Sequence, residues 1–156
     1  MSDTPQSLAD RLREEGGRVV DFFNSLSEEQ WEIGIYSQDY EWNMHDLLAH
    51  FVSAEIGRKE LIINVVAGGV GSPTDFDIDA YNHREVERLS GESNEYLLEL
   101  FSQERTQLIE LISNLDVADI VRLGNDPFLG EVKLLDMIKL TYRHLQIHLR
   151  DARRYL

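Results

Sequence analysis

The sequence contains no cysteine in its 156 residues. This absence excludes disulfides, iron–sulfur clusters, thiolate zinc sites and cysteine nucleophiles together. Proline is scarce as well, and the three prolines, Pro5, Pro73 and Pro127, fall at expected helix starts or in loops. Since proline breaks a helix only when it stands in the interior, long uninterrupted helices remain available to this chain.

Positive charge is also in short supply. The chain has 15 lysines and arginines against 29 aspartates and glutamates, which gives a formal net charge of −14. A field of this sign repels phosphate backbones and anionic membrane surfaces. We therefore expect neither a nucleic acid nor a membrane as a partner. The expected partner, a small-molecule substrate, belongs to the metal-site hypothesis given below.

Long hydrophobic runs are missing too. No apolar stretch approaches the roughly 20 residues that a membrane-spanning helix needs, and the N-terminal segment is polar, without the apolar core of a secretory signal. These features predict a cytoplasmic protein. The hydrophobic share of 42% and the charged share of 28% are ordinary for a globular chain, and the length suits one domain over residues 1–156.

The pattern that is present is helical, and no convincing strand appears. The apolar residues recur with a helical period in segments that begin after good capping residues, such as Thr4, Asn43 and Ser93. Expected helices run over 5–24, from 43 to about 67, over 77–89, from 93 to about 115, and over 131–154, with a short turn at 27–31 and a loop at 116–130. Four of them are near twenty residues long. This predicts an all-α four-helix bundle with a short additional helix.

Two histidines in the last expected helix are spaced for a shared ligand. His144 and His148 are four residues apart, so both imidazoles lie on one face, one turn from each other. Met137, Thr141 and Ala152 continue that face without a charge, which indicates that the face is turned inward.

His50 is the third candidate ligand, because it lies in an apolar stretch where an unpaired imidazole is costly to bury. Facing helices of a bundle can bring it to His144 and His148, and three ligands leave a coordination position open. The alternative is incidental histidines, since a pair four apart arises by chance in roughly one such chain in eight. His45 and His83 are expected on the surface.

Three motifs together resemble the DinB-like superfamily. They are Trp42-Asn43-Met44-His45-Asp46-Leu47-Leu48-Ala49-His50-Phe51, Phe76-Asp77-Ile78-Asp79-Ala80-Tyr81-Asn82, and the final His144-x-x-x-His148, in the order of that family. The resemblance implies a four-helix bundle and a metal held by histidines at positions 50, 144 and 148. Asn43 stands where relatives often have serine or threonine, which is a harmless change of cap.

The superfamily includes transferases and isomerases that use mycothiol, bacillithiol or glutathione. Its mycothiol-dependent isomerase branch tends to carry an acid in place of the histidine matching His144, so three histidines favour another branch.

Three functional hypotheses follow. The first is a metal-dependent enzyme, a thiol transferase or a hydrolase, with zinc or nickel on the three histidines, a low-molecular-weight thiol as cofactor, and Asn82 orienting the substrate. The alternative for Asn82 is a helix cap or a buried amide. The second hypothesis is a non-catalytic bundle that binds or senses a small molecule or a metal, and the third is a structural domain. A homodimer is also expected, since such bundles expose apolar stripes on their outer helices.

Overall fold

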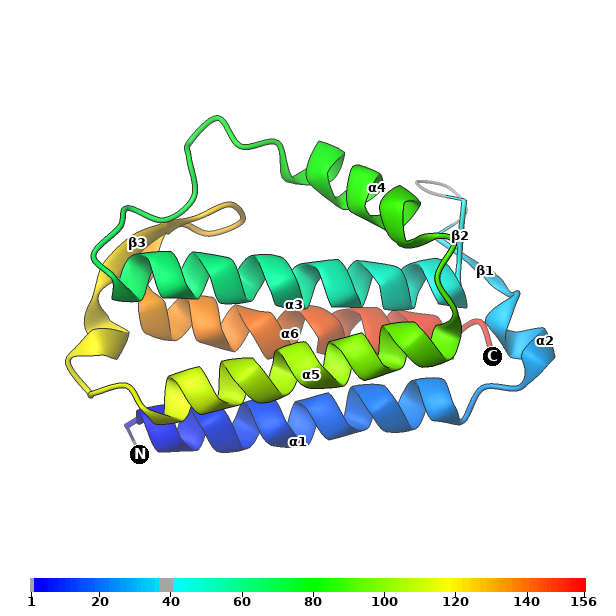
Figure 1. The fold of residues 1–156 in the computed structure, drawn as a ribbon, viewed down its shortest axis with the longest axis horizontal. Helices are drawn as coiled ribbons and strands as arrows, with labels where there is room; N and C mark the ends of the chain where they lie inside the picture. The colour runs from blue at the N-terminus through cyan, green and yellow to red at the C-terminus, as the bar shows by residue number, and fades with distance from the viewer. Residues whose placement is uncertain (1, 37–40) are drawn as a thin grey trace.

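The computed structural model describes residues 2–36 and 41–156. Four long helices run side by side, with α1 (Pro5–Asn24) and α5 (Asn94–Ser113) in one layer and α3 (Met44–Val66) and α6 (Leu134–Arg153) in the other (Figure 1). Around the bundle the order is α1, α5, α3, α6, since α1 and α3 both pack against α5 and α6. The expected mainly helical bundle is therefore confirmed.

Two shorter helices lie outside the four. The first is α2 (Glu28–Trp31), and the second is α4 (Ile78–Leu89), which packs over the outer side of α3 (Figure 1). A single turn of 3-10 helix, η1 (Asp119–Val121), follows α5. The C-terminal part of α4 adds Val86 and Leu89 to the hydrophobic core, so this helix is anchored on the bundle at that end.

Side-chain caps fix where the helices begin, as the sequence predicts. The hydroxyl of Thr4 accepts from the backbone N–H of Ser7 at 3.0 Å at the start of α1. At α3, the Asn43 side chain accepts from the Asp46 N–H, while Asp46 accepts from the Asn43 N–H, both at 3.0 Å. This reciprocal pair satisfies two otherwise unpaired donors and sets the register of α3 seven residues before His50.

Two small hairpins correct the expectation that no strand is present. The first pairs β1 (Gly34–Ile35) with β2 (Trp42–Asn43), and the second pairs β3 (Leu123–Asp126) with β4 (Gly130–Lys133), both antiparallel. The segment 116–130 is thus not all loop, and the last helix begins at Leu134, not at Glu131. Strands of two to four residues are too short to show an alternating pattern, which is why the sequence does not predict them.

The second hairpin is tied to the glycine-rich loop that follows α3. Gly71 forms a parallel bridge with Asn125, and its φ of +92° is a backbone conformation that favours glycine. A Cβ on Gly71 would lie only 2.5 Å from the Asn125 carbonyl oxygen. The close approach therefore needs glycine here, and it holds the loop and the hairpin together at one end of the bundle.

The hydrophobic core divides into two halves. One half contains the C-terminal part of α1 and the N-terminal parts of α3 and α5, and the other contains the opposite parts of these helices, with α6 crossing both. Between the halves lies a layer of buried polar side chains: Glu15, Glu55, Arg58, Arg105 and Thr141. Each member needs partners there, because an unpaired buried charge is costly.

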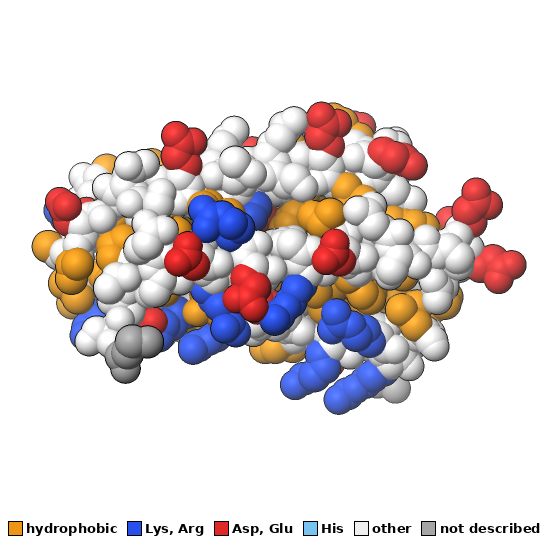
Figure 2. Space-filling view, turned by 90° about the horizontal axis from the view of Figure 1, so that it is seen from below, with side chains coloured by type: hydrophobic (Ala, Val, Ile, Leu, Met, Phe, Trp, Pro, Cys, Tyr) orange, Lys and Arg blue, Asp and Glu red, His pale blue; other side chains and the backbone are white. Residues whose placement is uncertain are grey.

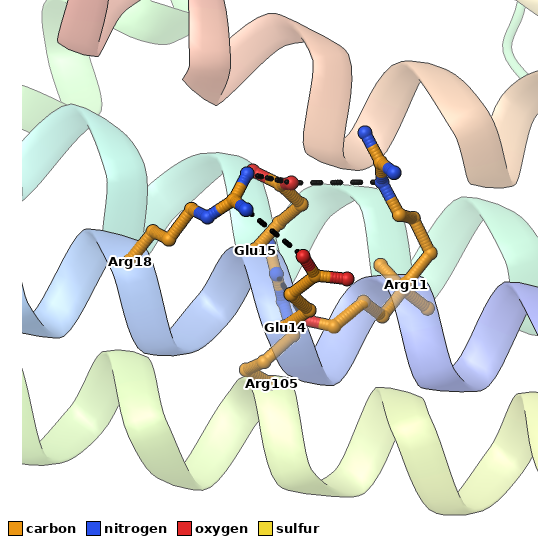
Figure 3. A network of polar contacts seen from close by, with 6 residues as sticks. Arg11, Glu14, Glu15, Arg18 and Arg105 are labelled. Carbon is orange, nitrogen blue, oxygen red and sulfur yellow. Dashed lines mark hydrogen bonds and ion pairs between the residues drawn. The ribbon is translucent and has the colours of Figure 1, made fainter.

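Two ion pairs supply some of those partners. Arg105 donates two hydrogen bonds to the Glu55 carboxylate, at 2.8 and 2.5 Å, and a third to the Leu12 carbonyl at 2.9 Å. Glu15 is paired with Arg18 at 2.8 Å near the same level, and Arg105 reaches in beneath α1 from α5 (Figure 3). The polar layer thus joins three helices across the middle of the bundle.

The outer surface shows both signs of charge. On the face in Figure 2, acidic and basic side chains are interspersed with hydrophobic ones, and the lysines and arginines gather along one side of the view. Within residues 2–36 and 41–156, no helix has the length and apolar character needed to cross a membrane.

Candidate metal centre

The three histidines predicted as ligands come together between α3 and α6. The Nε2 atom of His144 lies 2.9 Å from Nε2 of His148 and 3.5 Å from Nε2 of His50. One nitrogen from each ring lies within 4.8 Å of the other two. Residues 94 positions apart in the chain therefore converge on one point, as the spacing and the bundle predict.

Burial keeps these rings neutral. It lowers the pKa of His144 to about 3 and of His148 to about 4, with the neighbouring His148 and Arg58 adding to the effect on His144, and Asp151 opposing it at His148. The pKa of His50 is lowered well below its usual value, first by burial and then by the two other histidines. Neutral imidazoles offer free lone pairs at pH 7, which is the form that binds metals.

The ring of His148 is oriented by Tyr36 and Asp151. The Tyr36 hydroxyl lies 2.8 Å from Nδ1 of His148 and donates to Oδ2 of Asp151 at 2.9 Å. Since the hydroxyl has one proton and gives it to the carboxylate, it accepts from Nδ1–H of His148. That tautomer leaves Nε2 of His148 free as an acceptor, aimed at the other two rings.

His50 is the most deeply buried of the three, with 3% of its surface exposed. Its ring packs at 5.3 Å from the indole of Trp42, which stands in β2 directly before the α3 cap. Its Nδ1 is buried without a hydrogen-bond partner in the described part of the chain. The ring of His50 is therefore held by its packing against Trp42 and by the contact of its Nε2 with His144, and not through Nδ1.

The donor set fits a divalent ion. Three neutral nitrogens with lone pairs at 2.9 and 3.5 Å repel one another unless a cation or a proton lies among them. Bonds of about 2.0–2.1 Å to a tetrahedral zinc ion separate neighbouring ligand nitrogens by roughly 3.3 Å. The two distances from His144 lie on either side of this value, and all three nitrogens lie within 4.8 Å of one another. His50, His144 and His148 would hold the ion, and three ligands leave a position for another molecule.

A cavity of about 330 Å³ opens beside the histidines. Its walls come from α3, the loop after it, α4, the turn of the second hairpin, and α6, and they include His50, His144 and Asn82. Asn82 lies in the second turn of α4, so it is not a cap, and its half-buried side chain lines the cavity. The position agrees with the pocket role expected for Asn82, which stays a prediction.

The two remaining histidines stand apart from the cluster. His83 is exposed on α4, where the sequence places it. His45 differs from the expectation of a surface residue, because it is half-buried and its Nδ1 lies 2.5 Å from Oδ1 of Asn94 at the start of α5. The partner comes from another helix, which no sequence spacing reveals.

Sequence reasoning missed three polar residues around the site. Tyr36 carries no local pattern, since it lies in the irregular segment after β1. Asp151 could have been found, because it follows His148 by three residues and so shares its helical face. Arg58 could also have been found as a charge in the apolar stripe of α3, about two turns after His50.

Comparison with known structures supports the same architecture. The chain is similar to an uncharacterised protein from Escherichia coli UTI89, with a TM-score of 0.77 and 15% identical residues, over 99% of this chain and 94% of that one. At this identity the likeness concerns the fold alone. Among curated proteins none is significantly similar to the chain.

The sequence itself matches a family over nearly its whole length. Residues 11–152 match the DinB superfamily, a span that includes His50, His144 and His148. The helical bundle and the histidine cluster agree with the fold and the metal site which the sequence resemblance implied. The chain belongs to the DinB superfamily.

Proposed function

We propose that the protein is a divalent-metal-dependent enzyme that joins a low-molecular-weight thiol to a small electrophile. The observation that supports this is the convergence of three neutral imidazole nitrogens beside a cavity of about 330 Å³. Zinc and nickel are the proposed ions, because imidazole suits both. When bound, such an ion supplies a Lewis acid that lowers the pKa of a thiol or a water in its open position.

The residues of the chain have separate parts in this proposal. Tyr36 and Asp151 keep the proton of His148 on Nδ1, so that Nε2 faces the cluster. Apolar side chains in the cavity wall, such as Leu61, Phe76 and Phe128, would pack against the apolar part of the electrophile. Asn82 would orient the electrophile through its amide.

The thiol that attacks the electrophile has to belong to a bound small molecule, since the chain has no cysteine. In the net reaction a bond forms between the sulfur and a carbon of the electrophile, the bond from that carbon to its leaving group breaks, and the thiol proton passes to solvent. The thiol transfer follows the resemblance to thiol-using relatives, whereas the metal site follows from the residues themselves.

The metal site is tested by elemental analysis of protein purified without a histidine tag. We expect about one equivalent of zinc or nickel per chain, as for other three-histidine sites. His148→Ala should remove most of it, and His83→Ala, an exposed histidine on α4, should remove none. Less than roughly a tenth of an equivalent after incubation with either ion would contradict the proposal.

The reaction is tested by adding a panel of low-molecular-weight thiols and a bimane electrophile to metal-loaded protein. Thiol consumption should exceed that of a variant with alanine at all three histidines. Equal rates in the two proteins would end the enzyme proposal. Metal-dependent thermal stabilisation without product would instead support the alternative, a bundle that binds or senses a small molecule or a metal.

A further inference from the structure

The cavity beside the histidines has two partly exposed phenylalanines in its wall. Phe76 lies in the loop before α4 and is 39% exposed, and Phe128 lies in the turn between β3 and β4 and is 48% exposed. Phenylalanine is among the residues most often buried, so two such rings at one cavity are unusual. The tip of the second hairpin and α4 lie on the same side of α3 (Figure 1), and each segment contributes one of these rings to the cavity.

Phe128 lies against the histidine cluster. The centre of its ring is 5.9 Å from the centre of the His144 ring, and the two ring planes are inclined by 36°. Both side chains line the cavity. A molecule that packs on Phe128 inside the cavity is therefore next to one of the three candidate metal ligands.

The turn that presents Phe128 is fixed by a buried ion pair. Oδ1 of Asp126 accepts from the backbone N–H groups of Phe128 at 2.8 Å and of Leu129 at 3.2 Å. Oδ2 of Asp126 lies 2.7 Å from Nη2 of Arg58 on α3, and that nitrogen donates to the Met137 carbonyl on α6 at 2.8 Å. The turn is thus tied to both helices, so Phe128 is in place before a ligand arrives.

A second part of the wall is also aromatic. The ring centres of Phe76 and Tyr81 are 5.5 Å apart, and their planes are inclined by 52°. Tyr81 extends from α4 over α3, since a Cβ on Gly57 would lie 3.2 Å from its hydroxyl, and Gly57 lines the cavity as well. The lack of a side chain at Gly57 therefore leaves room for the tyrosine ring in the wall.

The cavity offers no free positive charge to a ligand. Among the described residues that line it, Arg58 is the single lysine or arginine, and its side chain is buried and paired with Asp126. Glu60, by contrast, is an exposed carboxylate in the wall. Burial raises the pKa of Tyr81, and the negative charges of Glu85 and Glu60 raise it further. The same negative charges disfavour an anion in the cavity.

The volume of the cavity suits a single ring with a short substituent. An apolar cavity of about 150 Å³ already admits benzene, and this one has about 330 Å³. Aromatic rings in contact stabilise each other beyond the apolar area that they bury. A planar ring can therefore gain from this wall what a saturated ring of the same size cannot.

We propose that the cavity binds the uncharged aromatic ring of a substrate, in contact with Phe128 and with the pair of Phe76 and Tyr81, and that it discriminates against saturated and anionic rings. The two phenylalanines are then the residues that determine specificity. The inference names the substrate class of the site proposed above and rests on that function only for the reaction.

The test compares three ligands of similar size by fluorine NMR titration of the full, metal-free protein. They are 4-fluorobenzamide, the anionic 4-fluorobenzoate, and trans-4-fluorocyclohexanecarboxamide, which has a saturated ring. The metal is left out because a carboxylate would bind to it directly. We expect the benzamide to bind roughly two- to tenfold more tightly than the saturated amide, as for an added aromatic contact.

The benzoate should bind at least about tenfold more weakly than the benzamide, because its carboxylate finds no free cation in the wall. The saturated amide has the larger apolar surface, so a cavity that selects by apolar area alone would bind it more tightly than the benzamide. The order of the three affinities therefore separates the proposal from simple apolar binding.

The variant that combines Phe76→Leu with Phe128→Leu keeps the wall apolar but removes both rings. It should lose the preference for the benzamide over the saturated amide. Both side chains are partly exposed, so we expect the variant to fold, and if it does not, each single leucine variant should weaken the preference. Tyr96→Leu is the matched control, since it removes an exposed aromatic ring on α5 away from the cavity and should keep the preference.

Equal or reversed affinities of the two amides in the wild-type protein, benzoate binding as tight as benzamide binding, or survival of the preference in the folded leucine variants would overturn the proposal. His148→Ala separates these outcomes from the proposed function. His148 is not among the described residues that line the cavity, so this variant should lose the metal and keep the aromatic preference. A protein that prefers the aromatic amide but consumes no thiol would retain this inference and lose the proposed reaction.

Discussion

Tyr36 combines a strained backbone with two functional hydrogen bonds. Its φ is +52°, in the left-handed region that residues other than glycine rarely adopt. Its hydroxyl joins Nδ1 of His148 to the Asp151 carboxylate. Strain of this kind persists only where other contacts hold it, and here those contacts are the ones that orient a candidate metal ligand.

We expect Tyr36→Phe to lower the affinity for zinc by about 10–100-fold, the usual effect of removing a hydrogen-bond partner of a metal-binding histidine. Competition with a chromogenic chelator would measure it. Tyr96→Phe is the control, since Tyr96 is exposed on α5 and should leave the affinity unchanged. Equal affinities in the Tyr36 variant and the wild type would show that His148 needs no such partner.

At the scale of the element, α1 contains two adjacent glycines with opposite environments. Gly16 is buried against Arg105, and an added Cβ would lie 2.9 Å from its Cγ, whereas nothing lies within 4 Å of a Cβ at Gly17. On propensity alone, both glycines weaken the helix. The structure gives a packing reason for Gly16 and none for Gly17.

Alanine substitutions should therefore change stability in opposite directions. Gly16→Ala displaces Arg105 from its Glu55 pair and should cost about 1–3 kcal/mol. Gly17→Ala should stabilise by roughly 0.5–1 kcal/mol, because alanine favours the helix and meets no obstacle. Urea unfolding of both variants checks this, and a stabilising Gly16→Ala would mean that Arg105 shifts at no cost.

The helices and the hairpins differ in how far local sequence predicts them. Thr4, Asn43 and Ser93 cap their helices as their positions predict, since a cap bonds within three residues of itself. The second hairpin depends on distant contacts, such as the bridge from Asn125 to Gly71 and the bond from the Leu134 N–H to the Arg122 carbonyl at 2.8 Å. The local sequence pattern therefore does not predict this hairpin, because it contains no information on contacts between distant segments.

At the scale of the whole molecule, the buried histidines couple folding to pH. Their pKa values are lower in the folded protein than the usual 6.5, so between about pH 4 and pH 6.5 the unfolded chain binds more protons. Stability in this window therefore rises with pH, and it is lost as the pH falls. Above about pH 6.5 the histidines are neutral in both the folded and the unfolded state, so they no longer lower the free energy of unfolding.

We expect the metal-free protein to lose stability from pH 6.5 to pH 4, by at most about 1.4 kcal/mol per pH unit for each histidine protonated on unfolding. Urea unfolding at several pH values measures the slope. The variant with alanine at positions 50, 144 and 148 should show a shallower slope than the wild type. Identical slopes would mean that these rings are not protected from protons in the folded state.

The sequence by itself determined the helical bundle and the identity of the three histidines. Periodicity, caps and the spacing of four between His144 and His148 act over a few residues, so a linear pattern records them. The place of His50 beside them followed from the family resemblance and from its apolar surroundings.

Only the tertiary structure decided the cavity, the tyrosine and aspartate beside His148, and the aromatic rings in the cavity wall. Each of these depends on side chains from separate helices and loops meeting at one point. These contacts depend on how the helices and loops pack against one another. Residues that are distant in sequence can be buried together or hydrogen-bonded at any separation along the chain, so no sequence spacing predicts them.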